Sequence, residues 1–85
     1  LIVLICSLLI GCGRKVTLDQ YNQIETGMSY EKAVEIIGTE GTEDVRSKSG
    51  EFEIVGYVWK NSNGSNMILM FQNGKLTTKA QAGLK

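Results

Sequence analysis

Few residues in this chain have side chains suited to catalysis. The 85 residues include no His and two cysteines, Cys6 and Cys12, both near the N-terminus. His is the commonest general base and metal ligand. Because the chain has none, its serine, threonine and carboxylate side chains lack an imidazole partner. Glu31 and Glu35 are spaced to share one face of a helix, but such acids usually form the solvated face of an amphipathic helix. We therefore expect no catalytic residues and no enzyme activity.

A metal, cofactor or nucleic-acid site is not expected either. Metal ions need clustered His, Cys or convergent acids, and Glu40, Glu43 and Asp44 fit no standard loop spacing. Ser62-Asn63-Gly64 lacks the glycine and lysine pattern of a phosphate-binding loop. Nine Lys and Arg balance nine Asp and Glu, so the chain has no basic footprint for nucleic acid. We expect no cofactor and no small-molecule substrate.

Cys12 has the clearest chemical role. It follows an apolar run over residues 1–10 that is interrupted only by Ser7. The run is shorter than the roughly 20 residues of a transmembrane helix and suits the apolar part of a secretory signal. Leu9-Ile10-Gly11-Cys12 resembles a bacterial lipobox. This resemblance implies that lipid is attached to the Cys12 sulfur and that the chain is cleaved before Cys12.

These features divide the chain into three parts. Residues 1–11 are interpreted as a truncated lipoprotein signal peptide, because the chain opens with Leu1 and not with Met and a basic residue. Residues 12–16 are a lipidated tether, and residues 17–85 form one domain. Several acyl chains on one residue give stable membrane anchoring. We expect the domain on the extracytoplasmic face of the cell membrane, or at the outer membrane in a Gram-negative host.

The domain is predicted to begin with two short helices. Thr17 and Gln20 have the capping-box pattern, and Gly27 is expected to end the first helix. Ser29 is the predicted N-cap of the second helix. Apolar residues at helical spacing follow Ser29 as far as Gly38, which is the expected C-terminal glycine.

The second half of the domain predicts β-structure. Residues 52–60 and 66–72 are rich in β-branched and aromatic side chains. Asn73-Gly74 favours a type I′ hairpin turn into a last strand over residues 75–81. Residues 40–48 predict a weak edge strand or an extended loop.

Helices that precede antiparallel strands indicate an α+β fold. We expect two short helices packed on one face of a three- to four-stranded antiparallel meander sheet. In the last strand, Leu76, Thr78 and Ala80 are expected to alternate with Lys75, Thr77 and Lys79. The candidate core residues are Leu18, Tyr21, Ile24, Met28, Tyr30, Val34, Ile37, Tyr57, Trp59, Met67, Leu69, Phe71 and Leu84.

The strand over residues 52–60 is apolar on both faces, and the helices can cover only one of them. The other face is a candidate interaction surface, unless terminal segments or sheet twist cover it. We expect a partner to contact the sheet around Tyr57 and Trp59, or a strand edge. The candidate surface residues are Phe52, Ile54, Val55, Tyr57 and Trp59.

Several segments resemble one lipoprotein family. Gly27-Met28-Ser29-Tyr30-Glu31-Lys32-Ala33 with Ile36-Ile37-Gly38 resembles the opening of lipoproteins with the β-lactamase-inhibitor-protein-like (BLIP-like) fold, a group that includes BamE (SmpA/OmlA). Tyr57-x-Trp59, Phe71-x-Asn73-Gly74-Lys75 and Lys79-x-x-x-Gly83-Leu84 are most similar to an uncharacterised branch. The resemblance covers about residues 17–84. It implies a BLIP-like, BamE-like fold and says less about activity.

The lipid anchor, the apolar second face and the lack of catalytic groups together predict a binding function. We expect a membrane-anchored, non-catalytic protein-binding module of the bacterial cell envelope, with another envelope protein as its partner. The alternative, by analogy of fold, is an inhibitor of a secreted or periplasmic hydrolase, either a β-lactamase or a protease.

Overall fold

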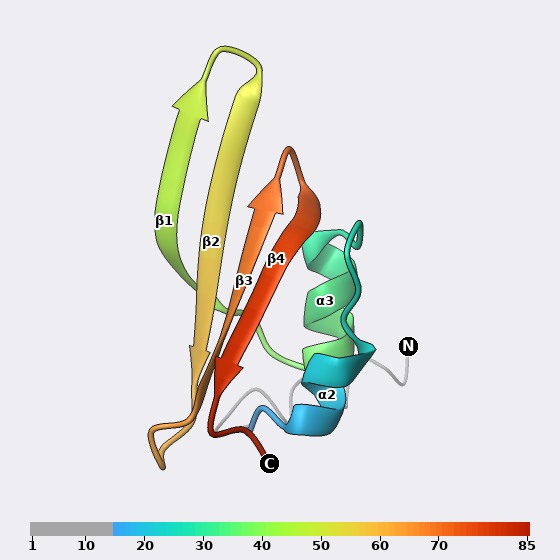
Figure 1. The fold of residues 1–85 in the computed structure, drawn as a ribbon, viewed down its shortest axis with the longest axis vertical. Helices are drawn as coiled ribbons and strands as arrows, with labels where there is room; N and C mark the ends of the chain where they lie inside the picture. The colour runs from blue at the N-terminus through green and yellow to red at the C-terminus, as the bar shows by residue number, and fades with distance from the viewer. Residues whose placement is uncertain (1–14) are drawn as a thin grey trace.

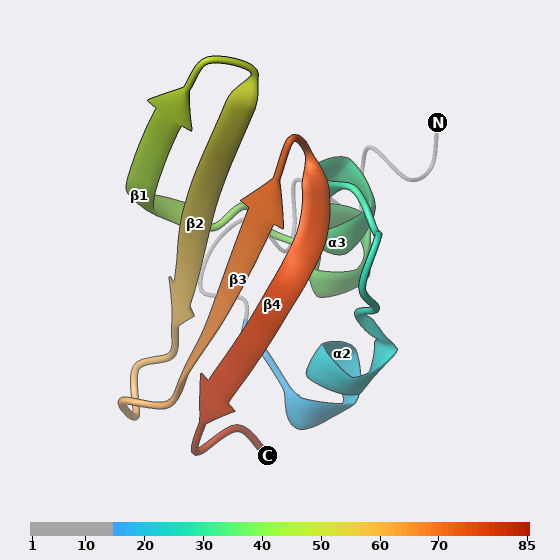
Figure 2. The same ribbon diagram turned by 45° about the horizontal axis from the view of Figure 1, so that its top comes forward.

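Two helices lie on one face of a four-stranded antiparallel sheet (Figures 1 and 2). The computed structural model describes residues 15–85, so the predicted signal and the lipobox lie outside the described residues. The strands follow one another in the order β1-β2-β3-β4, which is a simple meander. The predicted α+β architecture is confirmed. The elements are α2 (Leu18–Gln23), α3 (Tyr30–Ile37), β1 (Thr42–Ser49), β2 (Phe52–Lys60), β3 (Asn66–Gln72) and β4 (Lys75–Ala82).

Both helices begin at the predicted caps. The Thr17 hydroxyl accepts a hydrogen bond from the Gln20 N–H, and the Gln20 side chain accepts one from the Thr17 N–H. The Ser29 hydroxyl accepts from the Lys32 N–H in the same way. Gly38 ends α3 in the left-handed conformation, with φ of 92°. Local side-chain chemistry therefore sets both starts and one end.

The first helix ends earlier than predicted. It stops at Gln23, and Ile24 is extended and 1% exposed. The next residues pair with the sheet: the Gly27 N–H donates to the Leu76 carbonyl, and the Leu76 N–H donates to the Met28 carbonyl, both at 2.8 Å. Continuing the helix to Gly27 would remove these bonds and the burial of Ile24, so tertiary contacts prevail over local propensity.

The two central strands have the predicted bounds, and β1 is a strand and not a loop. Asn73 and Gly74 both have positive φ, 50° and 84°, as a type I′ turn requires. All eight residues of β1 are exposed. Its pairing with β2 skips Asp44. A bulge of this kind is common on edge strands, where it opposes pairing with another chain.

The other edge strand also contains a bulge, which changes the predicted alternation. Phe71 pairs with Leu76 and Met70 pairs with Thr78, so Thr77 is the extra residue. The prediction that Leu76, Thr78 and Ala80 share a face is wrong, because one inserted residue reverses the facing of all later side chains. Leu76 is buried at 1% exposure, whereas Thr78 and Ala80 are exposed.

The core lies between the helices and the sheet face that they cover. Every predicted core residue is either buried there or packs against the buried cluster. Four buried apolar residues are not among the predicted core residues: Val16, Ala33, Val55 and Leu76. Val16 was assigned to the tether, yet it is 2% exposed. The folded domain therefore begins slightly before Thr17.

Candidate interaction face

Alternation along β2 divides the candidate surface residues between two faces. Val55 and Trp59 are only 8% and 3% exposed, and Tyr57 packs against the buried cluster. The sheet face around Tyr57 and Trp59, where the sequence places a partner, thus packs against the helices and is not open to one in this structure. Contact at a strand edge stays a prediction. Phe52, which is 49% exposed, and Ile54 lie on the opposite face.

That opposite face, here called the open face, is apolar across three strands. Cross-strand neighbours share a face, and Val58 pairs with Ile68, Met70 with Gly56, and Gly56 with Val45. The large apolar side chains that the structure leaves exposed within residues 15–85 all lie here: Val45 at 45%, Phe52 at 49% and Ile68 at 38%. The apolar residues of the open face are Val45, Phe52, Ile54, Val58, Ile68 and Met70.

Gly56 lies in the centre of the open face, between Val45 and Met70. A Cβ atom on Gly56 would lie 2.7 Å from the Met70 sulfur and 3.6 Å from the Val45 Cβ. The Met70 side chain thus fills the space that another residue type would occupy. Because a thioether side chain is flexible and polarizable, the centre of the face can adjust to the shape of a partner.

A shallow cavity of about 250 Å³ lies beside the apolar residues. It is lined by Thr42 and Asp44 of β1 and by Val58 and Lys60 of β2. Asp44 is the extra residue of the β1 bulge, so the bulge supplies one of its two charged groups. The open face thus has an apolar centre and a charged margin, which is the usual anatomy of a protein interface.

An aromatic cluster under α3 fixes the connection from α3 to β1. The Tyr30 ring stacks on Tyr57 with ring centroids 4.1 Å apart. The Trp59 indole N–H donates to the Thr39 carbonyl at 2.9 Å, and the Gly41 N–H donates to the Tyr30 hydroxyl at 3.2 Å. Burial raises the pKa of the Tyr30 hydroxyl above its ordinary value, and the negative charge of Glu40 adds to this rise. The cluster thereby sets where β1 starts.

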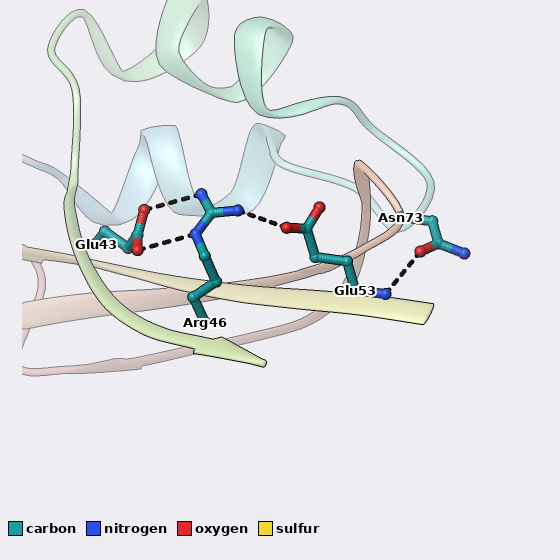
Figure 3. A network of polar contacts seen from close by, with 4 residues as sticks. All are labelled: Glu43, Arg46, Glu53 and Asn73. Atoms are coloured by element: carbon teal, nitrogen blue, oxygen red, sulfur yellow. Dashed lines mark hydrogen bonds and ion pairs between the residues drawn. The ribbon is translucent and has the colours of Figure 1, made fainter. Parts of the chain in front are cut away.

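An ion-pair network joins the two strands of the β1–β2 hairpin on its helix-side face (Figure 3). Arg46 lies 2.9 Å from Glu43 and 2.6 Å from Glu53. Hydrogen bonding to Arg46 holds the pKa of the Glu43 carboxyl below its ordinary value. The Glu53 N–H donates to the Asn73 side chain, so the network continues to the β3–β4 turn. These bonds brace the hairpin from the side away from the open face.

The carboxylates considered for chemistry are not gathered into a site. Glu35 pairs with Lys32 at 3.2 Å, and both side chains are mostly exposed. Glu43 is engaged by Arg46. Within residues 15–85, no three or more His, Cys, Asp or Glu residues converge on a possible metal position. Neither α2 nor α3 has the length and apolarity to cross a membrane. Cys12 lies outside the described residues.

Sequence and structure comparisons identify the family. Residues 17–85 match the β-lactamase inhibitor (BLIP) family, and the chain belongs to it. A similar solved structure is that of a candidate β-lactamase inhibitor protein from Streptococcus mutans, with 32% sequence identity and a TM-score of 0.69. The match covers 85% of this chain and 47% of that protein, so the chain spans about half of its length. No curated protein sequence matches the chain significantly. The relation to BamE stays a prediction.

Proposed function

We propose that this chain is a non-catalytic protein-binding domain that binds its partner through the open face. The observation that carries the proposal is the position of Val45, Phe52 and Ile68, which are 38–49% exposed on one face of the sheet. Contiguous exposed apolar surface on a small protein usually marks an interaction site. Membership of an inhibitor family supports a protein as the partner.

The proposal includes attachment to a membrane through Cys12. Its support is the lipobox-like segment Leu9-Ile10-Gly11-Cys12 after an apolar run. In this arrangement the domain lies on the extracytoplasmic face of the membrane and binds another envelope protein. Detergent phase partitioning and mass spectrometry of the mature N-terminus test the anchor. Recovery of the protein in the aqueous phase, with its leader intact, would contradict it.

A matched pair of variants tests the binding face. Phe52→Ser removes the most exposed large apolar side chain of the open face, whereas Glu51→Ser changes its exposed neighbour in the turn. Envelope proteins are crosslinked to the native lipoprotein in membranes and then recovered with it. We expect Phe52→Ser to lose the specific partner and Glu51→Ser to retain it. Equal recovery by both variants would show that the open face is not the site.

A second candidate function is inhibition of a secreted or periplasmic hydrolase, either a β-lactamase or a protease. It is favoured by the family match over residues 17–85 and by the likeness to the Streptococcus mutans protein. Assays of the purified protein against β-lactamases and envelope proteases test it. Inhibition that Phe52→Ser weakens and Glu51→Ser leaves unchanged would assign the activity to the open face. No inhibition of any enzyme tested would leave the envelope-partner function as the better proposal.

A further inference from the structure

The start of the domain is held firmly by the β2–β3 loop. Asn61 accepts a hydrogen bond from the Val16 N–H at 2.8 Å and donates one to the Val16 carbonyl at 2.9 Å. The Val16 side chain is 2% exposed. Because both backbone polar groups of Val16 are hydrogen-bonded to Asn61 and its side chain is buried, Val16 has one position relative to the sheet. The chain therefore enters the fold at a fixed point.

This entry point lies at one end of the sheet. The Leu18 N–H donates to the Lys85 carbonyl at 3.1 Å, which brings the last residues to the same place. Figures 1 and 2 show the first described residues, the β2–β3 loop and the C-terminus together at this end, here called the base, while the β1–β2 turn lies at the opposite end. The strands therefore run lengthwise between the base and that turn.

The sequence places Cys12 close to the base. Only Gly13, Arg14 and Lys15 lie between Cys12 and Val16. Four residue steps span at most about 14 Å even when fully extended. An acylated Cys12 must reside at the bilayer surface, so Val16, at the base, lies within that distance of it. This step rests on the lipid attachment that the proposed function includes.

The base also carries exposed lysines. Lys15 precedes Val16, Lys60 precedes Asn61, and Lys85 is bonded to Leu18 through its carbonyl. All three are exposed. Asp19 follows Leu18 and accepts a hydrogen bond from Gln23, and Asp44 lines the same cavity as Lys60. Lysines close to an anionic leaflet favour contact by about five-fold each.

We propose that the base is a membrane-facing surface that contacts anionic phospholipid headgroups through Lys15, Lys60 and Lys85. Because the Asn61–Val16 hydrogen bonds fix the N-terminal entry point relative to the β2–β3 loop, the orientation of the base also sets the orientation of the sheet. The long axis of the strands is then roughly perpendicular to the bilayer. Since β2 has nine residues, its end at Phe52 lies about 30 Å from the base. The open face then stands upright on the membrane and is accessible from the side to an envelope protein.

Depth-dependent quenching tests this orientation. Acylation blocks Cys12 in the mature lipoprotein, so one engineered cysteine can carry a fluorophore. Ser62→Cys places it in the β2–β3 loop and Glu51→Cys in the β1–β2 turn, both at exposed positions. Each labelled lipoprotein is reconstituted into vesicles of phosphatidylcholine and phosphatidylglycerol that contain a headgroup nitroxide lipid.

We expect strong quenching at residue 62 and at least five-fold weaker quenching at residue 51. Equal quenching at both positions, or stronger quenching at residue 51, would overturn the orientation. A protein that stays in the aqueous phase and also takes up label at Cys12 would instead refute the lipid attachment. The two failures are therefore distinguishable.

The lysine contact has its own matched control. Lys60→Gln with Lys85→Gln removes two charges at the base, and Lys48→Gln with Lys75→Gln removes two exposed charges elsewhere. The first pair should lower the equilibrium constant for headgroup contact about 25-fold, seen as weaker quenching at residue 62. The second pair should leave it unchanged. Equal effects of both pairs, or the same quenching in vesicles of phosphatidylcholine alone, would refute the headgroup contact.

Discussion

The Trp59 indole lies directly against Gly41, so that a Cβ atom on Gly41 would come within 2.8 Å of the ring carbons. The indole is held in this place by its hydrogen bond to the Thr39 carbonyl and by burial at 3% exposure. The connection from α3 to β1 can pass over Trp59 only because Gly41 has no side chain. The position of β1 thus depends on a glycine at residue 41.

Gly41→Ala is expected to lower the free energy of unfolding by about 1–3 kcal/mol, because the rigid indole cannot yield to the added methyl group. Urea unfolding monitored by Trp59 fluorescence measures this change.

Gly56→Ala is the control for that substitution. A Cβ atom on Gly56 would also be close to a neighbour, 2.7 Å from the Met70 sulfur. That sulfur belongs to a flexible side chain on the uncovered face, which can move aside, so the change should stay below about 1 kcal/mol. A larger loss for Gly56→Ala than for Gly41→Ala would contradict this account of the two sites.

Asn61→Ala should destabilise the domain, because it removes both hydrogen bonds to the Val16 backbone and the one to the Ser65 hydroxyl. The loss expected for these partly buried bonds and their unpaired backbone groups is about 2–3 kcal/mol. Ser62→Ala changes an exposed residue of the same loop and should be neutral. Urea midpoints measure both effects, and similar midpoints for the two variants would show that the Val16 contact contributes little.

Tyr30 makes the domain sensitive to alkaline pH. Burial raises its pKa above the ordinary value of 10.0, so the folded state retains the hydroxyl proton where the unfolded chain has lost it. The resulting stability is fully present below pH 10 and is lost as pH rises through the pKa of folded Tyr30. Wild-type protein should therefore lose more stability than Tyr30→Phe does as the pH rises from 10 through the pKa of folded Tyr30.

The same variant has a second expected effect at neutral pH. Tyr30→Phe leaves the Gly41 N–H without its acceptor, which should cost about 1 kcal/mol. Urea unfolding at several pH values separates the two effects. A parallel decline of wild-type and Tyr30→Phe stability at high pH would assign the alkaline loss to other groups.

Arg46→Gln should loosen the β1–β2 hairpin while the rest of the fold persists. The substitution removes the ion pairs to Glu43 and Glu53, and exposed pairs contribute little to global stability. Hydrogen exchange should therefore become faster in β1 and stay unchanged in β3. Unchanged exchange in β1 of Arg46→Gln would show that pairing with β2 alone fixes this strand.

Lowering the pH should loosen the wild-type hairpin too. Because the pKa of Glu43 is lowered, the ion pair with Arg46 persists above pH 4.5 and is lost as pH falls through the pKa of folded Glu43.

The sequence predicted those parts of the fold that local chemistry determines. Thr17 and Ser29 cap their helices with their own hydroxyl groups, and Asn73 and Gly74 tolerate positive φ. Such signals act over a few residues, so they can be read without knowledge of the tertiary fold. The continuous apolar run of β2 likewise predicted that both sheet faces carry apolar residues.

The parts that the sequence did not predict depend on distant contacts. Val16 is buried because Asn61 binds it from 45 residues away. The bulge at Thr77 arises from pairing with β3 and places Leu76 and Thr78 on opposite faces. The sequence could not assign the covered face of the sheet for the same reason: Tyr57 and Phe52 are both aromatic, and the packing of Tyr30 on Tyr57 distinguishes them. Exposure of Ile68 followed from its alternation with the buried Met67 and Leu69, a signal that was present in the sequence.

The hydrogen bond between Leu18 and Lys85 brings the entrance and the exit of the fold together. A polypeptide that enters and leaves at one spot can be spliced into a host protein, or repeated head to tail, with a linker of only a few residues. It can also be circularly permuted by joining these two points and opening the chain at the exposed Ser49-Gly50 turn. The domain is therefore suited to insertion into other proteins and to circular permutation.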